Sequence, residues 1–210
     1  SVTESDDVTL TGVTSSGAAQ PISISTTNGS ITLSGNVAAT GSGNVTLTAG
    51  STGAVNDILA GAGRVATGSG LVTLSGRGIG VGSASPVLTD LGTGTIKYTT
   101  TGAGALGDVA FSNSTAGGFN TNQIDATSGT NSGSAQTITM IQTAGDITAG
   151  TFSAGTDNLS LLATNGSIVG SGTLTANDLR LDGFNGVGAA GTPVLINAGQ
   201  VAARLTNAGA

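Results

Sequence analysis

The sequence predicts an all-β protein, a right-handed parallel β-helix with three short strands in each coil of about 20–27 residues. Three observations predict this fold. Apolar and polar residues alternate in short segments, these segments recur at a nearly constant interval, and glycine and asparagine lie between them. We expect one continuous β-helix over residues 1–210, an internal segment of a larger repetitive protein.

Short apolar-x-apolar triplets run through the whole chain. They are Val8–Leu10, Ile22–Ile24, Ile31–Leu33, Val45–Leu47, Val72–Leu74, Ile96–Tyr98, Ile138–Met140, Leu159–Leu161 and Leu179–Leu181. Apolar residues at every second position are typical of a strand with one face in the core and the other in solvent. The middle residue is usually Thr, Ser, Lys or Arg, and β-branched Thr suits an exposed strand position. No segment repeats apolar residues with helical spacing, so we expect almost no helix.

The triplets recur with the period of a solenoid coil. One series begins at Ile22, Val45, Val72 and Ile96, and a later series begins at Ile138, Leu159 and Leu179. Within both series the interval is the length of one coil. One coil cannot bury its own apolar face, so each coil must stack on the coils before and after it. The spacing therefore predicts a solenoid.

Further apolar positions inside each interval predict three strands per coil. In one coil, for example, Ile22 is followed by Ile31 and then by Val37. The corners after the first strand are alike, TTNGSI at 26–31 and ATNGSI at 163–168. Asn and Gly both tolerate the positive φ that a sharp corner demands.

The regular coils are interrupted in two places. Residues 52–66 lack a clear triplet, and the interval from Ile96 to Ile138 is longer than one coil. Near 52–66 and 99–135 we therefore expect longer loops or irregular coils. The whole chain should form about eight to ten coils, about 4.8 Å apart, in a rod on the order of 40 Å long.

The triplets also predict which side chains form the core. Lys97 and Arg180 each lie between two apolar residues and should point outward. The residues expected to point inward are Ile31, Val45, Leu47, Val72, Leu74, Ile96, Ile138, Met140, Leu159, Leu161, Ile168, Leu179 and Leu181.

Composition favours a folded chain with a thin, aliphatic core. Only 8% of the residues are charged, against roughly 25% in an average domain, and one Tyr and four Phe are the only aromatic residues. A mean hydropathy of +0.26 and a net charge of -6 disfavour charge-driven disorder. The alternatives are a flexible low-complexity linker and an antiparallel sandwich. The spaced triplets argue against the linker, and a sandwich would require regular hairpin turns and larger core residues.

With its triplets, Asn-Gly corners and glycine-rich segments, the chain resembles the repeat region of filamentous-haemagglutinin-like exoproteins, most strongly over 138–195. The resemblance implies a long right-handed β-helix within a large secreted protein of Gram-negative bacteria. It also implies export through an outer-membrane partner and a role as an adhesin, a filament, a biofilm component or a stalk that carries a toxin. The secretion domain of that family carries Asn-Pro motifs, and no Asn-Pro dipeptide occurs here, so we expect an internal segment.

The sequence predicts no enzyme, with no catalytic residue, no cofactor-binding residue and no metal ligand. Without histidine or cysteine, the usual serine triad and thiolate metal sites are excluded. Asp57, Asp157 and Asp178 each adjoin an Asn, and we expect their side chains to cap corners. Asp178, Arg180 and Asp182 should share one face of an exposed, ion-paired strand. A polysaccharide-binding or polysaccharide-degrading β-helix is the first alternative function, because that fold can carry carboxylates on an outer face.

Ice binding by a threonine ladder is the second alternative function. Thr-x-Thr pairs occur at Thr9/Thr11, Thr46/Thr48, Thr93/Thr95, Thr99/Thr101, Thr137/Thr139 and Thr173/Thr175. The spacing between these pairs is irregular, and Thr is also a common exposed strand residue.

The main prediction is therefore a structural or adhesive stalk or filament segment, secreted to the outside or the surface of a Gram-negative cell. Unpaired strand edges at Ser1 and Ala210 should associate with a second copy or with the rest of the parent filament. Host or matrix glycans or proteins are the other candidate partners. The five basic residues are scattered, so we expect neither a nucleic acid partner nor an anionic membrane partner, and no run of about 20 apolar residues predicts membrane insertion.

Overall fold

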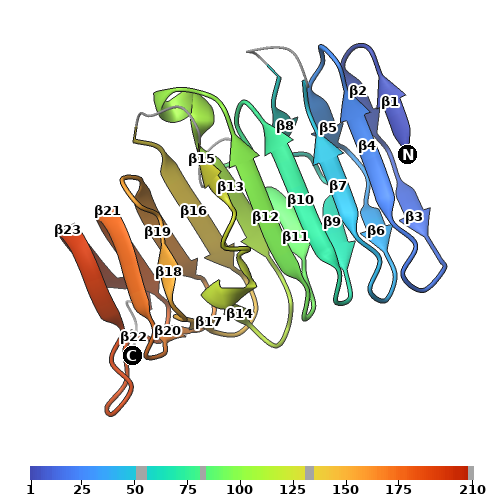
Figure 1. Cartoon of the computed structure of the whole chain (residues 1–210). Helices are drawn as coiled ribbons and strands as arrows, with labels where there is room; N and C mark the ends of the chain where they lie inside the picture. The colour runs from blue at the N-terminus through green and yellow to red at the C-terminus, as the bar shows by residue number, and fades with distance from the viewer. Residues whose placement is uncertain (51–55, 81–83, 131–134, 208–210) are drawn as a thin grey trace.

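A computed structural model describes residues 1–50, 56–80, 84–130 and 135–207 of the chain. Strands take up 53% of the residues and helical turns only 4%, and the parallel strands stack into a solenoid of about eight turns (Figure 1). The predicted parallel β-helix is thus confirmed. Residues 52–55 and 131–134 of the two irregular regions, and the strand edge expected at Ala210, lie outside the described residues.

Three sheets build the N-terminal part of the solenoid, and one strand of each sheet belongs to each coil. The six-stranded sheet contains β1 (Val2–Glu4), β4 (Ile22–Thr26), β7 (Val45–Thr48), β10 (Leu71–Gly76), β12 (Thr95–Thr100) and β15 (Gly129–Thr130). The three-stranded sheet contains β2 (Val8–Leu10), β5 (Ile31–Leu33) and β8 (Ile58–Leu59). The ten-stranded sheet begins with β3 (Val13–Ser15), β6 (Val37–Ala39), β9 (Arg64–Thr67) and β11 (Val87–Asp90).

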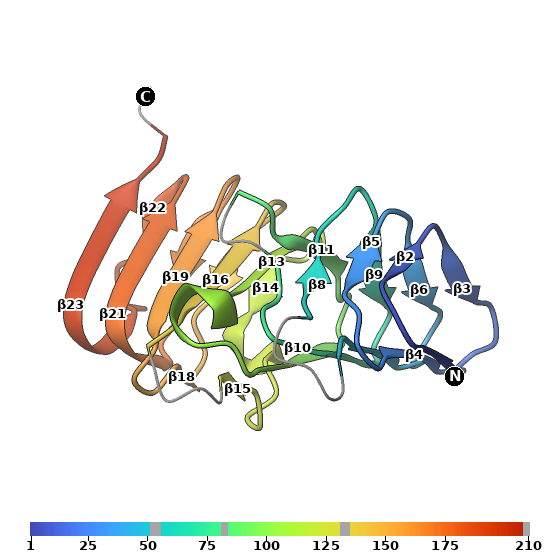
Figure 2. The same cartoon turned by 90° about the horizontal axis from the view of Figure 1, so that it is seen from above.

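The ten-stranded sheet continues through the C-terminal half of the solenoid, where a fourth sheet joins it (Figure 2). Its later strands are β13 (Val109–Asn113), β16 (Thr137–Gln142), β18 (Phe152–Ser153), β19 (Asn158–Ala163), β21 (Thr173–Gly183) and β23 (Leu195–Leu205). The four-stranded sheet contains β14 (Phe119–Asn120), β17 (Ile147–Thr148), β20 (Ser167–Val169) and β22 (Gly186–Val187). Two short 3-10 helices, η1 (Gly104–Gly107) and η2 (Thr121–Gln123), lie at corners, and no helix within the described ranges is long and apolar enough to cross a membrane.

The register of the strands stacks similar residues of successive coils on one another. Ile22 pairs with Val45, Val45 with Val72 and Val72 with Ile96, and all four side chains are buried. Every residue that the sequence predicted to point inward is at most 2% exposed, which confirms the predicted core. Lys97 lies between buried neighbours on β12 and faces outward, as predicted.

The cross-section of the solenoid changes near β13. Ile79 forms β-bridges with both Ile58 and Val109. The start of β13 therefore lies in line with the three-stranded sheet, whereas the rest of β13 belongs to the ten-stranded sheet. Phe111 on β13 and Phe119 on β14 pack edge to face, with ring centroids 5.8 Å apart and an interplanar angle of 74°. These two rings fill the corner where the fourth sheet begins.

This change explains the long interval in the sequence. Ile96 on β12 bridges Ile124 in the next coil, whereas Ile138 on β16 pairs with Val109. Ile96 and Ile138 therefore lie on different sheets, and the interval between them does not measure one coil. It contains one complete coil, from Ile96 to Ile124, and part of the next coil, and the elements between its ends are η1, β13, β14, η2 and β15.

Glycine is required at corners where the backbones of successive coils pass closely. A Cβ added to Gly70 would lie 2.2 Å from the carbonyl oxygen of Gly43, and one added to Gly94 would lie 2.3 Å from that of Gly70. Those separations are far inside van der Waals contact, so a larger residue would push the coils apart. The stacked corner glycines account for part of the high glycine content.

Candidate functional site

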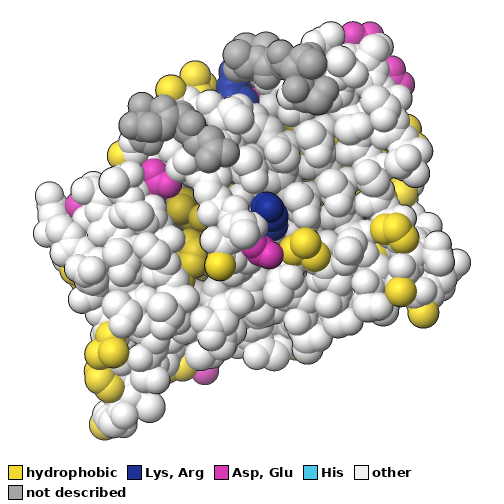
Figure 3. All heavy atoms as spheres, in the orientation of Figure 1, with side chains coloured by type: hydrophobic (Ala, Val, Ile, Leu, Met, Phe, Trp, Pro, Cys, Tyr) yellow, Lys and Arg dark blue, Asp and Glu magenta, His cyan; other side chains and the backbone are white. Residues whose placement is uncertain are grey.

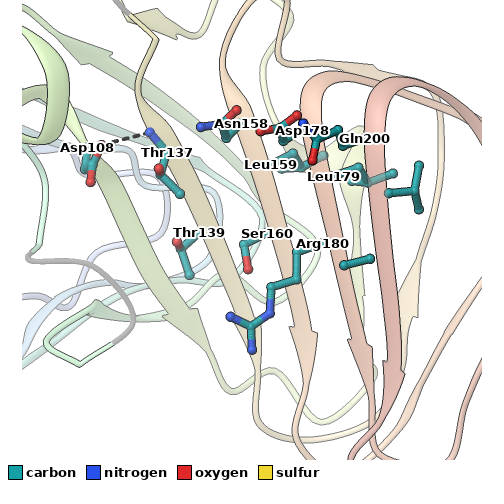
Figure 4. A pocket seen from close by; sticks show the side chains of 12 residues that line it. Asp108, Thr137, Thr139, Asn158, Leu159, Ser160, Asp178, Leu179, Arg180 and Gln200 are labelled. Atoms are coloured by element: carbon teal, nitrogen blue, oxygen red, sulfur yellow. Dashed lines mark hydrogen bonds between the residues drawn. The ribbon is translucent and has the colours of Figure 1, made fainter.

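An open groove of about 450 Å³ crosses the outer face of the ten-stranded sheet near its C-terminal end (Figure 4). Its floor carries a row of polar side chains with one residue from each strand, here called the polar ladder: Thr137 on β16, Asn158 on β19, Asp178 on β21 and Gln200 on β23. Asp108, directly before β13, extends this row at one end.

The register of the strands builds the ladder. Thr137 pairs with Asn158, and Asp178 pairs with Gln200. Leu159 pairs with Leu179, which places the preceding residues Asn158 and Asp178 side by side. Because Leu159 and Leu179 point into the core, strand alternation turns their neighbours outward. A second outward row, two residues further along, contains Thr139, Ser160, Arg180 and Ala202.

Asp108 is held at the edge of the groove by a backbone hydrogen bond. The Thr137 N–H donates to Asp108 Oδ1 at 2.8 Å (Figure 4). Burial raises the pKa of Asp108 above its ordinary value, the hydrogen bond from Thr137 partly opposes this, and the negative charge of Asp157 adds to the increase. Asp108 therefore takes up a proton more readily than an exposed aspartate.

Next to the groove, Asp182 accepts hydrogen bonds from two arginines. Arg180 Nη2 lies 2.6 Å and Arg204 Nη2 lies 2.9 Å from Asp182 Oδ2. Burial by itself would raise the pKa of Asp182, but the hydrogen bonds and charges of the two arginines outweigh it, so the pKa is lowered. The predicted ion-paired strand is correct for Arg180 and Asp182. The expected exposure of Asp182 is wrong, because its side chain is covered by the arginines and only 4% exposed.

Two of the three aspartates expected to cap corners do so. Asp57 Oδ1 accepts from the Gly78 N–H at 3.0 Å, and Asp157 Oδ1 accepts from the Gln136 N–H at 3.0 Å. Asp178 differs, because within the described part of the chain its side chain forms neither a hydrogen bond nor an ion pair. It lies in the groove instead.

The outer face of the six-stranded sheet carries an ordered array of hydroxyl side chains. Ser23, Thr46 and Thr73 form one row, and Ser25, Thr48 and Ser75 form a second row two residues further along each strand. Over β4, β7 and β10 this face shows mostly neutral, polar surface (Figure 3). The Thr-x-Thr pairs of the sequence do not stack into one ladder, because they lie on several sheets.

The N-terminal end of the solenoid leaves apolar residues uncovered. A hollow of about 640 Å³ opens there, with Val2, Val8, Leu10, Ile22 and Ile24 among its lining residues. Val2 is 60% exposed although its strand neighbour Ile24 is buried. The inward-facing row is therefore uncovered at this end.

The C-terminal end is uncovered in the same way. Ile196 and Val201 on β23 pair with the buried residues Leu174 and Leu179, yet they are 40% and 50% exposed. Leu205 continues this inward-facing row and is 61% exposed. Each of the two ends thus presents the same type of apolar row that lies buried inside the solenoid.

Chemistry at the groove is limited by the distance between its carboxylates. Asp108 and Asp178 stand three strands apart in the same row, a separation of about 14 Å. Glycosidase carboxylate pairs lie about 5–9.5 Å apart, so these two do not form such a pair. Among the described residues there is no cluster of three or more His, Cys, Asp or Glu side chains that could hold a metal ion.

The sequence singled out Asp178, Arg180 and the Thr137/Thr139 pair but not the groove that contains them. Asn158, Ser160 and Gln200 carried no motif, since their role depends on which strands stack together. Neither a protein-family model, a curated protein nor a solved structure matches this chain.

Proposed function

We propose that this chain is a stalk or filament segment of a secreted bacterial surface adhesin of the filamentous-haemagglutinin-like kind, and that its ends stack on further coils. The observation that carries the proposal is the uncovered inward row at each end. Ile196 and Val201 pair with buried residues of the preceding coil, and at the other end Val2 pairs with a buried residue of the following coil. Covering these rows with another coil would remove apolar surface from water, which favours stacking.

The backbone at the C-terminal end supports the same proposal. β23 has eleven residues and pairs with β21 on one side, and no described strand pairs with its other side. A long strand with free N–H and C=O groups is a template for another strand. A stacked coil would satisfy these groups and bury the apolar row in one step.

The charges at the two ends differ. The N-terminal coil exposes Glu4, Asp6 and Asp7, whereas Arg204 on β23 is paired with Asp182. Like charges disfavour stacking of two N-terminal ends on each other. The association should therefore run head to tail, as a filament requires.

Sedimentation velocity over a range of concentrations tests the proposal. The unaltered chain should associate as its concentration rises, and Ile196→Asp should weaken that association by at least about tenfold, because a charge is then placed in the apolar row. Thr73→Asp, a change to the same residue type on the outer face of β10, is the matched control and should associate normally. A chain that stays monomeric at high concentration, or an Ile196→Asp variant that associates as well as the control, would contradict the proposal.

The secreted location and the outer-membrane secretion partner belong to the same proposal and need a different test. The reading frame around this segment should encode further coils with the same period and a secretion domain before them. Immunolabelling of intact cells of the source bacterium should then detect the segment at the surface or in the medium. A frame that encodes an unrelated cytosolic protein would overturn this part.

Ice binding is a second candidate function, favoured by the hydroxyl array on the six-stranded sheet. The array is regular along the solenoid because each row repeats once per strand spacing, about 4.8 Å. Thr3 Oγ1 and Ser25 Oγ lie 3.1 Å apart, so neighbouring hydroxyls in one row are close enough to share hydrogen bonds. A measurement of thermal hysteresis tests this function, and Thr46→Lys should abolish any activity found. Absence of thermal hysteresis would remove this candidate.

A further inference from the structure

We infer that the groove over the polar ladder binds an extended, electrically neutral glycan chain. The inference rests on the adhesive part of the proposed function and deepens it by naming a ligand class and a site. It depends on a different part of the molecule from the end-to-end contact. If the chain associates end to end but binds no glycan, only the glycan inference fails. If it binds a glycan but stays monomeric, only the proposal of end-to-end stacking fails.

The repeat of the groove suits a polymer. Thr137, Asn158, Asp178 and Gln200 follow one another at about 4.8 Å, the spacing of adjacent strands. A sugar unit in an extended polysaccharide advances by a similar length. Consecutive sugars can therefore each meet a polar side chain on consecutive strands, which a compact ligand could not do.

Several side chains that line the groove have free hydrogen-bonding capacity, although Asn158 Oδ1 already accepts from Asn177 Nδ2 at 3.0 Å. Within the described ranges, the side chains of Asp178, Gln200 and Ser160 form no hydrogen bond to the protein. A carboxylate accepts through two oxygens, an amide both donates and accepts, and a hydroxyl does the same. Adjacent sugar hydroxyls present the complementary set of donors and acceptors. The groove volume of about 450 Å³ is within the range of ligand sites, about 300–1,000 Å³.

The charge of the groove selects a neutral glycan over an anionic one. Asp108 and Asp178 are its two acidic groups, and Arg180 is its one basic group. The guanidinium of Arg180 already donates to Asp182, with Nε 2.8 Å from Oδ2, so it is partly neutralised. A sulfated or uronate-rich chain would meet a net negative surface and would be repelled. Because the two groove carboxylates are about 14 Å apart, the site can bind a glycan but does not have the carboxylate pair needed to cleave it.

Isothermal titration calorimetry of the intact chain, at a concentration where it is monomeric, tests the inference. The probes are neutral cello-, manno- and N-acetylchito-oligosaccharides of increasing length, with heparin oligosaccharides as the anionic comparison. Affinity for at least one neutral series should rise with length until the sugar chain spans the ladder and should then level off. Heparin oligosaccharides should bind more weakly than that series.

Substitutions locate the site. Asp178→Ala should lower the affinity about tenfold, the loss expected for one hydrogen bond to a charged group. Gln200→Ala, a second variant at an exposed position, should lower it by a smaller factor. Thr73→Ala on the six-stranded sheet is the matched control and should bind normally. Far-UV circular dichroism should give the same strand content for all three variants.

Three results would overturn the inference. One is the absence of binding to every neutral series at millimolar ligand. The second is tighter binding of heparin oligosaccharides than of any neutral series. The third is an Asp178→Ala variant that binds as well as the Thr73→Ala control, which would place the glycan elsewhere on the solenoid.

Discussion

The guanidinium of Arg77 lies against the carboxylate of Asp57, which belongs to the preceding coil. Arg77 Nε donates to Asp57 Oδ1 at 2.9 Å, Nη2 donates to Oδ2, and the Gly78 N–H donates to Oδ1 at 3.0 Å. Both side chains are largely buried, with 22% of Arg77 and 16% of Asp57 exposed. The hydrogen bond to Asp57 raises the pKa of Arg77. One aspartate thus ties the corner of its own coil to the backbone and the side chain of the next coil.

Asp57→Ala should lower the free energy of unfolding by about 2 kcal/mol, because Arg77 and the Gly78 N–H then lose their acceptor. Asp57→Asn, which keeps one acceptor oxygen, should lower it by less. Urea unfolding followed by circular dichroism measures both. Asp6→Ala, at an exposed aspartate of the first coil, is the control and should change the free energy by less than about 0.5 kcal/mol. Equal effects at Asp57 and Asp6 would show that the corner contact contributes nothing.

Asp182→Asn should remove stability at neutral pH and have less effect in acid. Because the two arginines lower the pKa of Asp182 in the folded state, its contribution is present above the unfolded pKa of about 3.9 and is lost as the pH falls through the lower folded value. Near pH 7 the variant should be less stable by about 1–2 kcal/mol. The difference between the two proteins should shrink as the pH is lowered below about 4. A difference that stays constant over this range would contradict the ion-pair explanation.

Asp108→Asn should act in the opposite direction. Burial raises the folded pKa of Asp108, so the ionised side chain disfavours folding at neutral pH, and this cost shrinks as the pH falls through the raised folded pKa and is absent below the unfolded pKa of about 3.9. The amide retains an acceptor for the Thr137 N–H without the charge. The variant should therefore equal or exceed the unaltered protein in stability at pH 7 and lose that advantage in acid. Thermal unfolding at several pH values measures this, and a clear loss of stability at pH 7 would contradict it.

Phe111→Ala should be among the most destabilising single changes, at about 3–5 kcal/mol, because it leaves a cavity where the cross-section changes. Phe111 is completely buried and packs on Phe119. Leu195→Ala, at an apolar side chain that is 46% exposed and faces outward, is the control and should cost less than about 1 kcal/mol. Similar losses at both positions would show that the corner at β13 is not tightly packed.

Gly70→Ala should destabilise the protein by at least about 2 kcal/mol, because the added Cβ would lie 2.2 Å from the carbonyl oxygen of Gly43 in the coil before. Gly117→Ala is the matched control. A Cβ at Gly117 would have no atom within 4 Å, so this change should stay within about 0.5 kcal/mol of the unaltered protein. Denaturant unfolding compares the two. Tolerance of Ala at Gly70 would show that the corners can move apart without cost.

The sequence by itself determined the local conformation and the inward face of the strands. Alternation along Val45–Leu47 or Leu159–Leu161 is a property of neighbouring residues, because a strand turns successive side chains to opposite faces wherever it lies. The apolar residues could therefore be assigned to the core before their partners were known. The same local rule turned Lys97 and Arg180 outward.

Only the tertiary structure decided which strands stack together, and the candidate site depends on that. Ile96 and Ile138 look alike in the sequence but lie on different sheets, because the residues between them change the cross-section of the solenoid. The polar ladder arises from residues a full coil apart, such as Asn158 and Asp178, which become neighbours only when the coil closes in one register. Asp182 is buried for the same reason: the second arginine that covers it, Arg204, comes from the next coil. Alternation is set by the local backbone, whereas contacts between coils depend on the length and path of every corner between them.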